Sequence, residues 1–312
     1  MDFYKKQAQK GMPSFDEKII RQISRAEDYM MSPALERAVN MALYLGQPLL
    51  LTGQPGTGKT ELARHLASHF SDDGSLKNLY VFNTKTTSVA SDLFYQYDSL
   101  RHFQYAQKQE NKQLDPNEVE QRFIRYQALG EAIKSNQRAI VLIDEIDKAP
   151  RDLPNDILDV LEHLSFEVPE IGYIGNKRIK TSPENRPLVI LTSNSEKNLP
   201  DAFLRRCVFF HIPFPSPDQL NRILMKKTSG LSEEQLTKIV DLFQEIREQC
   251  HRKQPATAEL LQWMKVLEVL HQNKKLNIDH LDNPNEEENE ILKSTYSILV
   301  KDKEDLKEVL NI

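Results

Sequence analysis

The sequence predicts an α/β protein: a five-stranded parallel sheet with flanking helices, followed by a small all-helical domain. Five short runs of apolar, β-branched or aromatic residues indicate buried strands, at 48–52, 79–82, 139–143, 188–192 and 208–212. Helical patterns fill the first three gaps between these runs, and strands that alternate with helices are typical of a parallel sheet. After Pro213 the alternation ends, and the rest of the chain has helical patterns only.

The helices of the first domain are predicted from apolar spacing. Residues 33–45 carry apolar side chains at the spacing of an amphipathic helix, and residues 61–70 have a similar pattern. The gap between the second and third strands is long, and we expect two helices there, over 91–110 and 116–134. Between 165 and 187, two glycines and three prolines predict a hairpin that protrudes before the fourth strand.

In the second domain, two helices are predicted from their first residues. Ser216, Pro217 and Gln219 combine an N-cap, a proline in the first turn and a capping-box partner, and Ser232 with Gln235 repeats the box. A third helix is expected over about 256–270.

These elements divide the chain into three parts. Residues 1–30 are a polar lead-in that we expect to be helical. Residues 31–214 form the α/β domain, with inserted helices at about 84–138 and the hairpin at about 165–187. Residues 215–312 form the helical domain, which ends in an acidic C-terminal extension.

Composition excludes several classes of protein. The chain has 312 residues and a formal net charge of −5, and no apolar run approaches the length needed to cross a bilayer. The N-terminus has no apolar segment of the secretory type. Cys207 and Cys250 are the only cysteines, too few for a disulfide framework or a four-cysteine zinc site. The cytoplasm is therefore the expected compartment, and a broad nucleic-acid-binding face is disfavoured.

A glycine-rich turn follows the first strand and matches the pattern of a phosphate-binding loop in full. Such a loop turns successive backbone N–H groups toward phosphate oxygens, and the helix that follows adds its positive end. The lysine can reach the β- and γ-phosphates, and the threonine hydroxyl can ligate Mg²⁺. The predicted nucleotide-binding residues are Gly53, Gln54, Pro55, Gly56, Thr57, Gly58, Lys59, Thr60 and Glu61.

Two carboxylates, Asp144 and Glu145, end the third strand. Buried charge is costly unless it is paired or bound to metal, so two acids at a strand end need an explanation. In nucleotide hydrolysis the first holds Mg²⁺ and the second polarises the attacking water. The alternative is a solvated pair of acids, which the phosphate loop upstream makes the weaker interpretation. Asp144 and Thr60 are thus the predicted Mg²⁺ residues.

Two further polar features lie near the fourth and fifth strands. Asn194 follows the fourth strand, where its amide would face the same cleft and orient water against the γ-phosphate. Arg205 and Arg206 come just before the fifth strand, and arginine stabilises the charge that develops on a transferred phosphoryl group. The alternatives are a turn asparagine and surface arginines that pair with local acids.

Taken together, the segments GQPGTGKT, VLIDEID, LTSN and LPDAFLRR resemble those of an AAA+ ATPase. The inserted helices and the hairpin are similar to the helix-2-insert branch, and LTSNSEKNLPDAFLRRCVFFHIPFP with PATAELLQW most resembles the MoxR family. The resemblance covers about residues 30–275.

This resemblance implies roles for individual residues. Lys59 and Thr60 would belong to Walker A, Asp144 and Glu145 to Walker B, and Asn194 would be sensor 1. Arg206 would be the finger that acts on ATP held by a neighbouring subunit, with Arg205 beside it.

The resemblance also implies partners and a cofactor set. The cofactors would be ATP and Mg²⁺, the assembly a ring of six copies, and the second domain a lid. MoxR-type proteins act as remodelling or maturation chaperones, and a protein with a von Willebrand factor type A domain is the implied partner. One departure concerns the sensor-2 arginine. The stretch from Arg252 to Ala258 has no arginine after its proline, and Arg252 and Lys253 are the available substitutes.

The sequence therefore leaves three functions open. The first is Mg²⁺-dependent ATP hydrolysis by a ring that remodels a protein client. The second is a nucleotide-gated assembly switch with negligible turnover, which the missing arginine keeps open. The third is a DNA-directed AAA+ motor, which the acidic composition and the lack of a basic-aromatic stripe disfavour.

Overall fold

A computed structural model describes residues 26–108, 115–172, 178–195 and 197–310. The described residues form two compact units. The α/β unit contains residues 31–53 and 59–212. The helical unit contains residues 26–30, 54–58 and 213–310. Of the predicted lead-in, residues 26–30 are described, and Ala26–Asp28 form a short 3₁₀ helix, η1; the rest of the lead-in lies outside the described residues.

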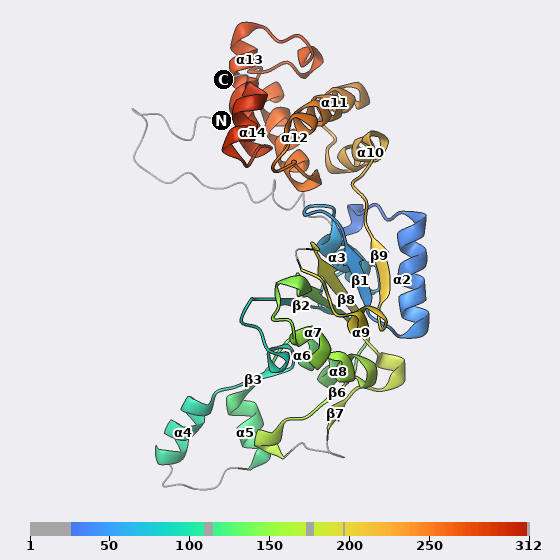
Figure 1. Ribbon diagram of the computed structural model, residues 1–312, viewed down its shortest axis with the longest axis vertical. Coiled ribbons are helices and arrows are strands. Elements are labelled where there is room, and N and C mark those ends of the chain that lie inside the picture. The colour runs from blue at the N-terminus through green and yellow to red at the C-terminus, as the bar shows by residue number, and fades with distance from the viewer. Residues whose placement is uncertain (1–25, 109–114, 173–177, 196, 311–312) are drawn as a thin grey trace. The chain divides into compact units, whose positions relative to one another are not determined.

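The α/β unit is built on one parallel sheet, and this part of the predicted fold class is confirmed (Figure 1). The strand order β2-β5-β8-β1-β9 places β8 and β1 in the interior of the sheet, and every residue of these two strands is buried. Continuous apolar runs suit such positions because helices cover both faces of a parallel sheet. The strands are β1 (Leu49–Thr52), β2 (Leu79–Asn83), β5 (Ile140–Asp144), β8 (Leu188–Ser193) and β9 (Val208–His211).

The first helix shows how the sequence sets an element's ends. Helix α2 spans Pro33–Leu45, as predicted, and Ser32 caps it by accepting a hydrogen bond from the Leu35 backbone N–H. Gly46 ends it in the left-handed conformation, which glycine adopts without steric cost. The other helical segments of the sheet region are α3 (Lys59–His69), α6 (Ala128–Ser135), η3 (Ile146–Lys148), α7 (Leu153–Asp156), α8 (Leu158–His163) and α9 (Asp201–Leu204).

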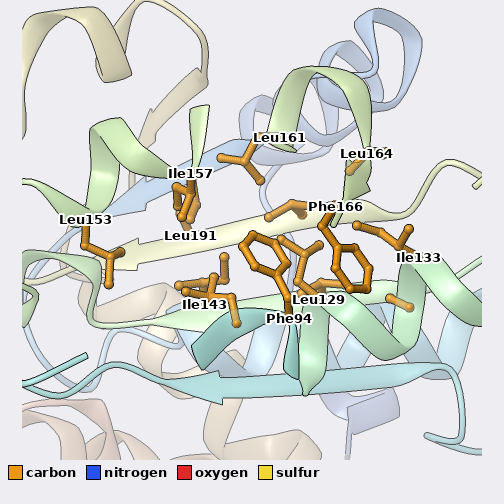
Figure 2. Close-up of a cluster of buried hydrophobic side chains, with 14 of the residues drawn as sticks. Phe94, Leu129, Ile133, Ile143, Leu153, Ile157, Leu161, Leu164, Phe166 and Leu191 are labelled. Carbon is orange, nitrogen blue, oxygen red and sulfur yellow. The ribbon is translucent and has the colours of Figure 1, made fainter. Parts of the chain in front are cut away.

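The largest core of this unit lies where α6, α7 and α8 meet strands β5 and β8. Figure 2 shows Ile143 and Leu191 from the two strands among side chains from these helices. Phe94 and Phe166 stack there, with ring centroids 5.3 Å apart. The core therefore joins the inserted segment and the hairpin to the strands that end in Asp144 and Ser193.

The inserted segment corrects two predictions. In place of one helix over 91–110, the chain forms η2 (Ala90–Leu93), strand β3 (Tyr95–Tyr97) and helix α4 (Ser99–Lys108). The helix predicted over 116–134 is divided into α5 (Pro116–Phe123), β4 (Ile124–Tyr126) and α6.

Pairing between distant segments explains the difference. Strands β3 and β4 form an antiparallel ladder in which Tyr95 lies opposite Tyr126. A three-residue strand has too few residues to show a period of its own in the sequence, and it is stabilised by a partner about thirty residues away. The predicted hairpin at 165–187 is present as the antiparallel pair β6 (Ser165–Phe166) and β7 (Ile179–Lys180), with 3₁₀ turns η4 (Pro169–Ile171) and η6 (Pro183–Asn185).

The helical unit begins with the two capped helices that the sequence predicts. Ser216 and Ser232 each accept a hydrogen bond from the backbone N–H three residues on, and Gln219 and Gln235 bond back to them. The only tryptophan of the sequence, Trp263, is fully buried in this unit. Its helices are α10 (Pro217–Lys227), α11 (Glu233–Gln249), α12 (Thr257–Gln272), η7 (Ile278–His280), α13 (Glu286–Thr295), η8 (Tyr296–Ile298) and α14 (Lys303–Leu310). No helix among the described residues is long and apolar enough to span a bilayer.

Candidate nucleotide site

The candidate site lies at the edge of the sheet where the parallel strands end. Strands β5 and β8 are neighbours, with Ile143 opposite Leu191, so Asp144 comes beside Thr192 at the end of the ladder. Strand β1 pairs with the other side of β8, and the glycine-rich loop follows β1 directly. Gly53 and Lys59, which flank the loop, and the two acids are therefore brought to one edge by strand order, as the sequence predicts for the ends of parallel strands.

The loop has the backbone that its glycines allow. Gly56 and Gly58 have φ of 75° and 88°, in the left-handed region where a side chain is strained. The Thr57 hydroxyl donates to the Gln54 carbonyl at 2.8 Å, which closes the turn from Gln54 to Thr57. Pro55 is exposed in the loop. Glu61 forms a 3.8 Å ion pair with Arg64, one turn further along α3.

Lys59 is buried although it carries a charge. Its ammonium donates to the Gly53 carbonyl at 2.7 Å, and only 7% of the residue is exposed. Burial lowers the pKa of Lys59, while the negative charges of Asp144, Asp147 and Glu145 act in the opposite direction. The Lys59 ammonium thus lies near three carboxylates, directly after the glycine-rich loop, where it can bind a polyphosphate.

Thr60 and Asp144 fit a hard divalent cation. The Thr60 hydroxyl lies 3.2 Å and 3.3 Å from the two carboxylate oxygens of Asp144. Hydroxyl and carboxylate oxygens are the protein ligands that Mg²⁺ prefers, and it takes its other ligands from phosphates and water. The donor set that the sequence predicts for Mg²⁺ is thus assembled within one unit.

Glu145 is held on several sides. Its backbone adopts φ 56° and ψ 48°, a left-handed conformation that is uncommon outside glycine, asparagine and aspartate. Its carboxylate accepts from the Lys148 ammonium at 2.6 Å and from the Asn194 side-chain amide at 3.3 Å. Asn194 is in turn held by its own backbone N–H, which donates to Asp147 at 3.1 Å. The predicted acid and the predicted amide are thus in direct contact.

Three of the contributing residues were not predicted from the sequence. Thr192 is fully buried, and its hydroxyl contacts both Asp144 and the Glu145 backbone. Two hydroxyl residues end the otherwise apolar strand LVILTS, and this was a signal that could have identified Thr192. Lys148 and Asp147 lie within three residues of Glu145, where a charged pair after a strand-end acid could have been noted.

Arg205 and Arg206 are not brought to this edge. Both precede β9, which runs parallel to β1, so they lie at the opposite, amino-terminal edge of the sheet. Both are exposed, and the Arg206 guanidinium is 3.7 Å from the Glu162 carboxylate. Arg206 lines a cavity of about 920 Å³ there, together with Arg138 and Arg186. The structure therefore separates the arginines from the acids of the same chain.

The predicted substitutes for a sensor-2 arginine are both exposed. Arg252 lies 4.0 Å from Asp302, and Lys253 offers its backbone N–H to Asp305. Another arginine of the helical unit, Arg247, is buried instead. It lies over the Phe214 ring, and it donates to the Pro255 carbonyl and to the Gln54 side chain, which belongs to the same unit. Arg247 was not among the residues predicted from the sequence.

A phosphate loop between a parallel strand and a helix, with two acids at the end of a nearby strand, defines the class of P-loop nucleotide-binding proteins. A family model described as "AAA domain (dynein-related subfamily)" matches residues 48–207, just over half of the chain. The chain belongs to this family.

Two curated proteins are similar to it. CD-NTase-associated protein 6 of Pseudomonas aeruginosa is 26% identical over 223 residues, which are 66% of this chain and 60% of that protein. The ATP-dependent Clp protease ATP-binding subunit ClpE of Lactococcus lactis is 27% identical over 232 residues, 67% of this chain and 27% of ClpE. The chain therefore matches less than two thirds of the length of either relative.

Two solved structures are also similar to this chain. NtrX from Brucella abortus in complex with ATP is 18% identical, with a TM-score of 0.46 over 82% of this chain and 56% of that one. RuvB from Thermotoga maritima is 16% identical, with a TM-score of 0.46 over 88% of this chain and 69% of that one.

Proposed function

We propose that this protein is a Mg²⁺-dependent ATPase. One observation carries the proposal: Lys59, Thr60, Asp144, Glu145 and Asn194, all of the α/β unit, meet at one edge of the sheet, with Asn194 in contact with Glu145 and Thr60 in contact with Asp144. A loop that only bound nucleotide would not need a carboxylate poised beside an amide at the same edge. The membership of the AAA family supports the choice of ATP as the nucleotide.

Each residue then has a task that its chemistry suits. The backbone of residues 53–58 and the Lys59 ammonium bind the phosphates, and Thr60 and Asp144 hold the cation. Mg²⁺, when bound, neutralises charge on the β- and γ-phosphates. Glu145 accepts the proton of the attacking water, and Asn194 orients its carboxylate.

The position of the arginines supports action between copies. Arg206 lies at the edge of the sheet opposite Glu145, so it cannot reach the phosphates of its own chain without refolding the unit. We therefore propose that it acts as a finger on ATP held by a neighbouring copy, in a ring of six, with Arg205 beside it. A finger is typically worth about 10³–10⁵ in rate.

We further propose the domain organisation and the client. Residues 31–214 form the nucleotide-binding domain, the helices of 215–312 act as its lid, and the insertions at about 84–138 and 165–187 face the client. The ring is of the MoxR type, works in the cytoplasm, and remodels or matures a protein client, with a von Willebrand factor type A protein as partner. Similarity to an ATP-binding subunit of a Clp protease supports a protein client over nucleic acid.

The test is ATP hydrolysis per subunit as a function of protein concentration. We expect specific activity to rise with concentration, and Glu145→Gln to abolish turnover while it still binds ATP. Arg206→Ala should lose turnover as well, and mixing it with Glu145→Gln should restore activity, because each copy then supplies what the other lacks. Arg138→Ala, at another exposed arginine that lines the same cavity, is the matched control and should retain most activity.

Two results would overturn this function. Binding of Mg·ATP without turnover at any concentration, with a nucleotide-dependent change in oligomeric state, would favour the assembly switch. Turnover that DNA stimulates, with binding that weakens steeply as salt rises, would favour the DNA-directed motor.

A further inference from the structure

The Thr192 hydroxyl makes two hydrogen bonds at the end of strand β5. Its Oγ1 donates to Asp144 Oδ1 at 2.5 Å and accepts the backbone N–H of Glu145 at 2.8 Å. The side chain is fully buried in β8, which lies between β5 and β1. One hydroxyl thus contacts both of the strand-end acids.

This position requires a hydroxyl. A threonine oxygen has one proton to donate and lone pairs to accept, so it can serve a carboxylate and an N–H at the same time. Valine has the same shape but neither function, and it would leave an oxygen of the half-buried Asp144 carboxylate and the Glu145 backbone N–H without this partner.

The backbone of Glu145 adds a second reason. A non-glycine residue in the left-handed region is held there by its surroundings. The contact to Thr192 is made by the N–H of this residue, whereas Lys148 and Asn194 contact its carboxylate. Thr192 therefore restrains the main chain from which the Glu145 side chain projects.

We propose that Thr192 is a positioning residue for hydrolysis. It fixes the Asp144 carboxylate and the Glu145 backbone relative to each other, and this fixes the position of the cation relative to the attacking water. The inference rests on the proposed ATPase activity. It concerns the chemical step and the use of Mg²⁺, and it does not require Thr192 to touch the nucleotide.

The test compares Thr192→Val with Thr192→Ser, and uses Ser193→Ala as a matched control. Ser193 is the next residue of β8 and is also buried, but its hydroxyl accepts from the Ser195 backbone N–H. The measurements are kcat and KM for ATP, ADP affinity at several Mg²⁺ concentrations, and the thermal unfolding midpoint.

We expect Thr192→Val to lower kcat about 10- to 100-fold, the effect of losing one hydrogen bond to a charged group, with KM within about threefold of the parent. Thr192→Val should also require a higher Mg²⁺ concentration than the parent to reach the same ADP affinity. Thr192→Ser keeps the hydroxyl and should retain kcat within about threefold, as should Ser193→Ala. A purely structural role would lower the unfolding midpoint of Thr192→Val without separating kcat from KM.

Several results would overturn the inference. One is a Thr192→Val protein with parental kcat and parental Mg²⁺ dependence, and another is an equal loss in Ser193→Ala. If the valine variant does not fold, Thr192→Cys replaces it, since a thiol is a weak donor, and a parental kcat there contradicts the proposal. If the parent binds Mg·ATP without turnover, the proposed function fails separately, and the Mg²⁺ dependence of ADP binding in Thr192→Val decides the role of Thr192.

Discussion

Replacing Gly130 by alanine tests how closely helix α6 approaches the inserted segment. Gly130 is a buried residue in the first turn of α6 and lies against the backbone of Phe94. The side chains of Phe94 and of Leu129, its neighbour in sequence, pack in the core of the α/β unit (Figure 2). A Cβ built there would lie 1.9 Å from the Phe94 carbonyl oxygen and 2.6 Å from the carbonyl carbon. Because these are backbone atoms, rotation of a side chain cannot relieve the contact.

The cost can be worked from the contacts. Cβ atoms essentially never approach within 3.0 Å, so the two segments must separate by about 1 Å. That shift breaks the 2.9 Å hydrogen bond from the Gln127 N–H to the Phe94 carbonyl, worth about 1 kcal/mol. Overpacking adds about 2 kcal/mol, and the better helix propensity of alanine returns about 1 kcal/mol. The net loss is about 2 kcal/mol, or about 4–8 °C in the unfolding midpoint of a unit of this size.

Calorimetry and tryptophan emission separate the two units in this experiment. Trp263 is the only tryptophan and is buried in the helical unit, so its emission follows that unit. We expect the α/β transition to fall and the Trp263 transition to stay. Glu131→Ala, at an exposed position of the same helix, should change the free energy of unfolding by less than about 0.5 kcal/mol. A Gly130→Ala protein as stable as the parent would refute the close approach.

Two further predictions concern charged groups. Lys148→Met should raise ATP turnover by up to about fivefold with KM unchanged. An ion pair of this exposure is worth up to about 1 kcal/mol, and its loss frees the Glu145 carboxylate for water. Steady-state kinetics tests this prediction, and a lower kcat in the variant would contradict it. Burial raises the pKa of Asp305, but hydrogen bonds from the backbone N–H groups of residues 251–253 outweigh it and leave the pKa lowered. Asp305 therefore stabilises the helical unit above the ordinary aspartate pKa of about 3.9, and this contribution is lost as pH falls through the lowered value. Asp305→Asn should lower the Trp263 unfolding midpoint at pH 7, and the difference should shrink toward pH 2; a constant difference would exclude the charge as its cause.

Local sequence patterns predicted the parts of this protein that a short stretch of chain can specify. The apolar runs predicted all five strands of the sheet to within two residues, apolar spacing predicted α2, and capping residues predicted where α10 and α11 begin. The phosphate loop was predicted because its glycines, Lys59 and Thr60 are contiguous. In each case the physical cause, steric freedom or a capping hydrogen bond, acts within a few residues.

Only the tertiary structure decided which distant groups meet. The ladder of β3 with β4, the glycine at 130 and the hydroxyl of Thr192 each depend on a partner about thirty to fifty residues away. Strand order placed Glu145 and Asn194 in contact and put Arg206 at the opposite edge of the sheet, although the sequence names all three as candidates of one reaction. Hydrophobic burial is non-directional, so the apolar pattern predicts which residues are inside, whereas register and packing decide which polar atoms face each other.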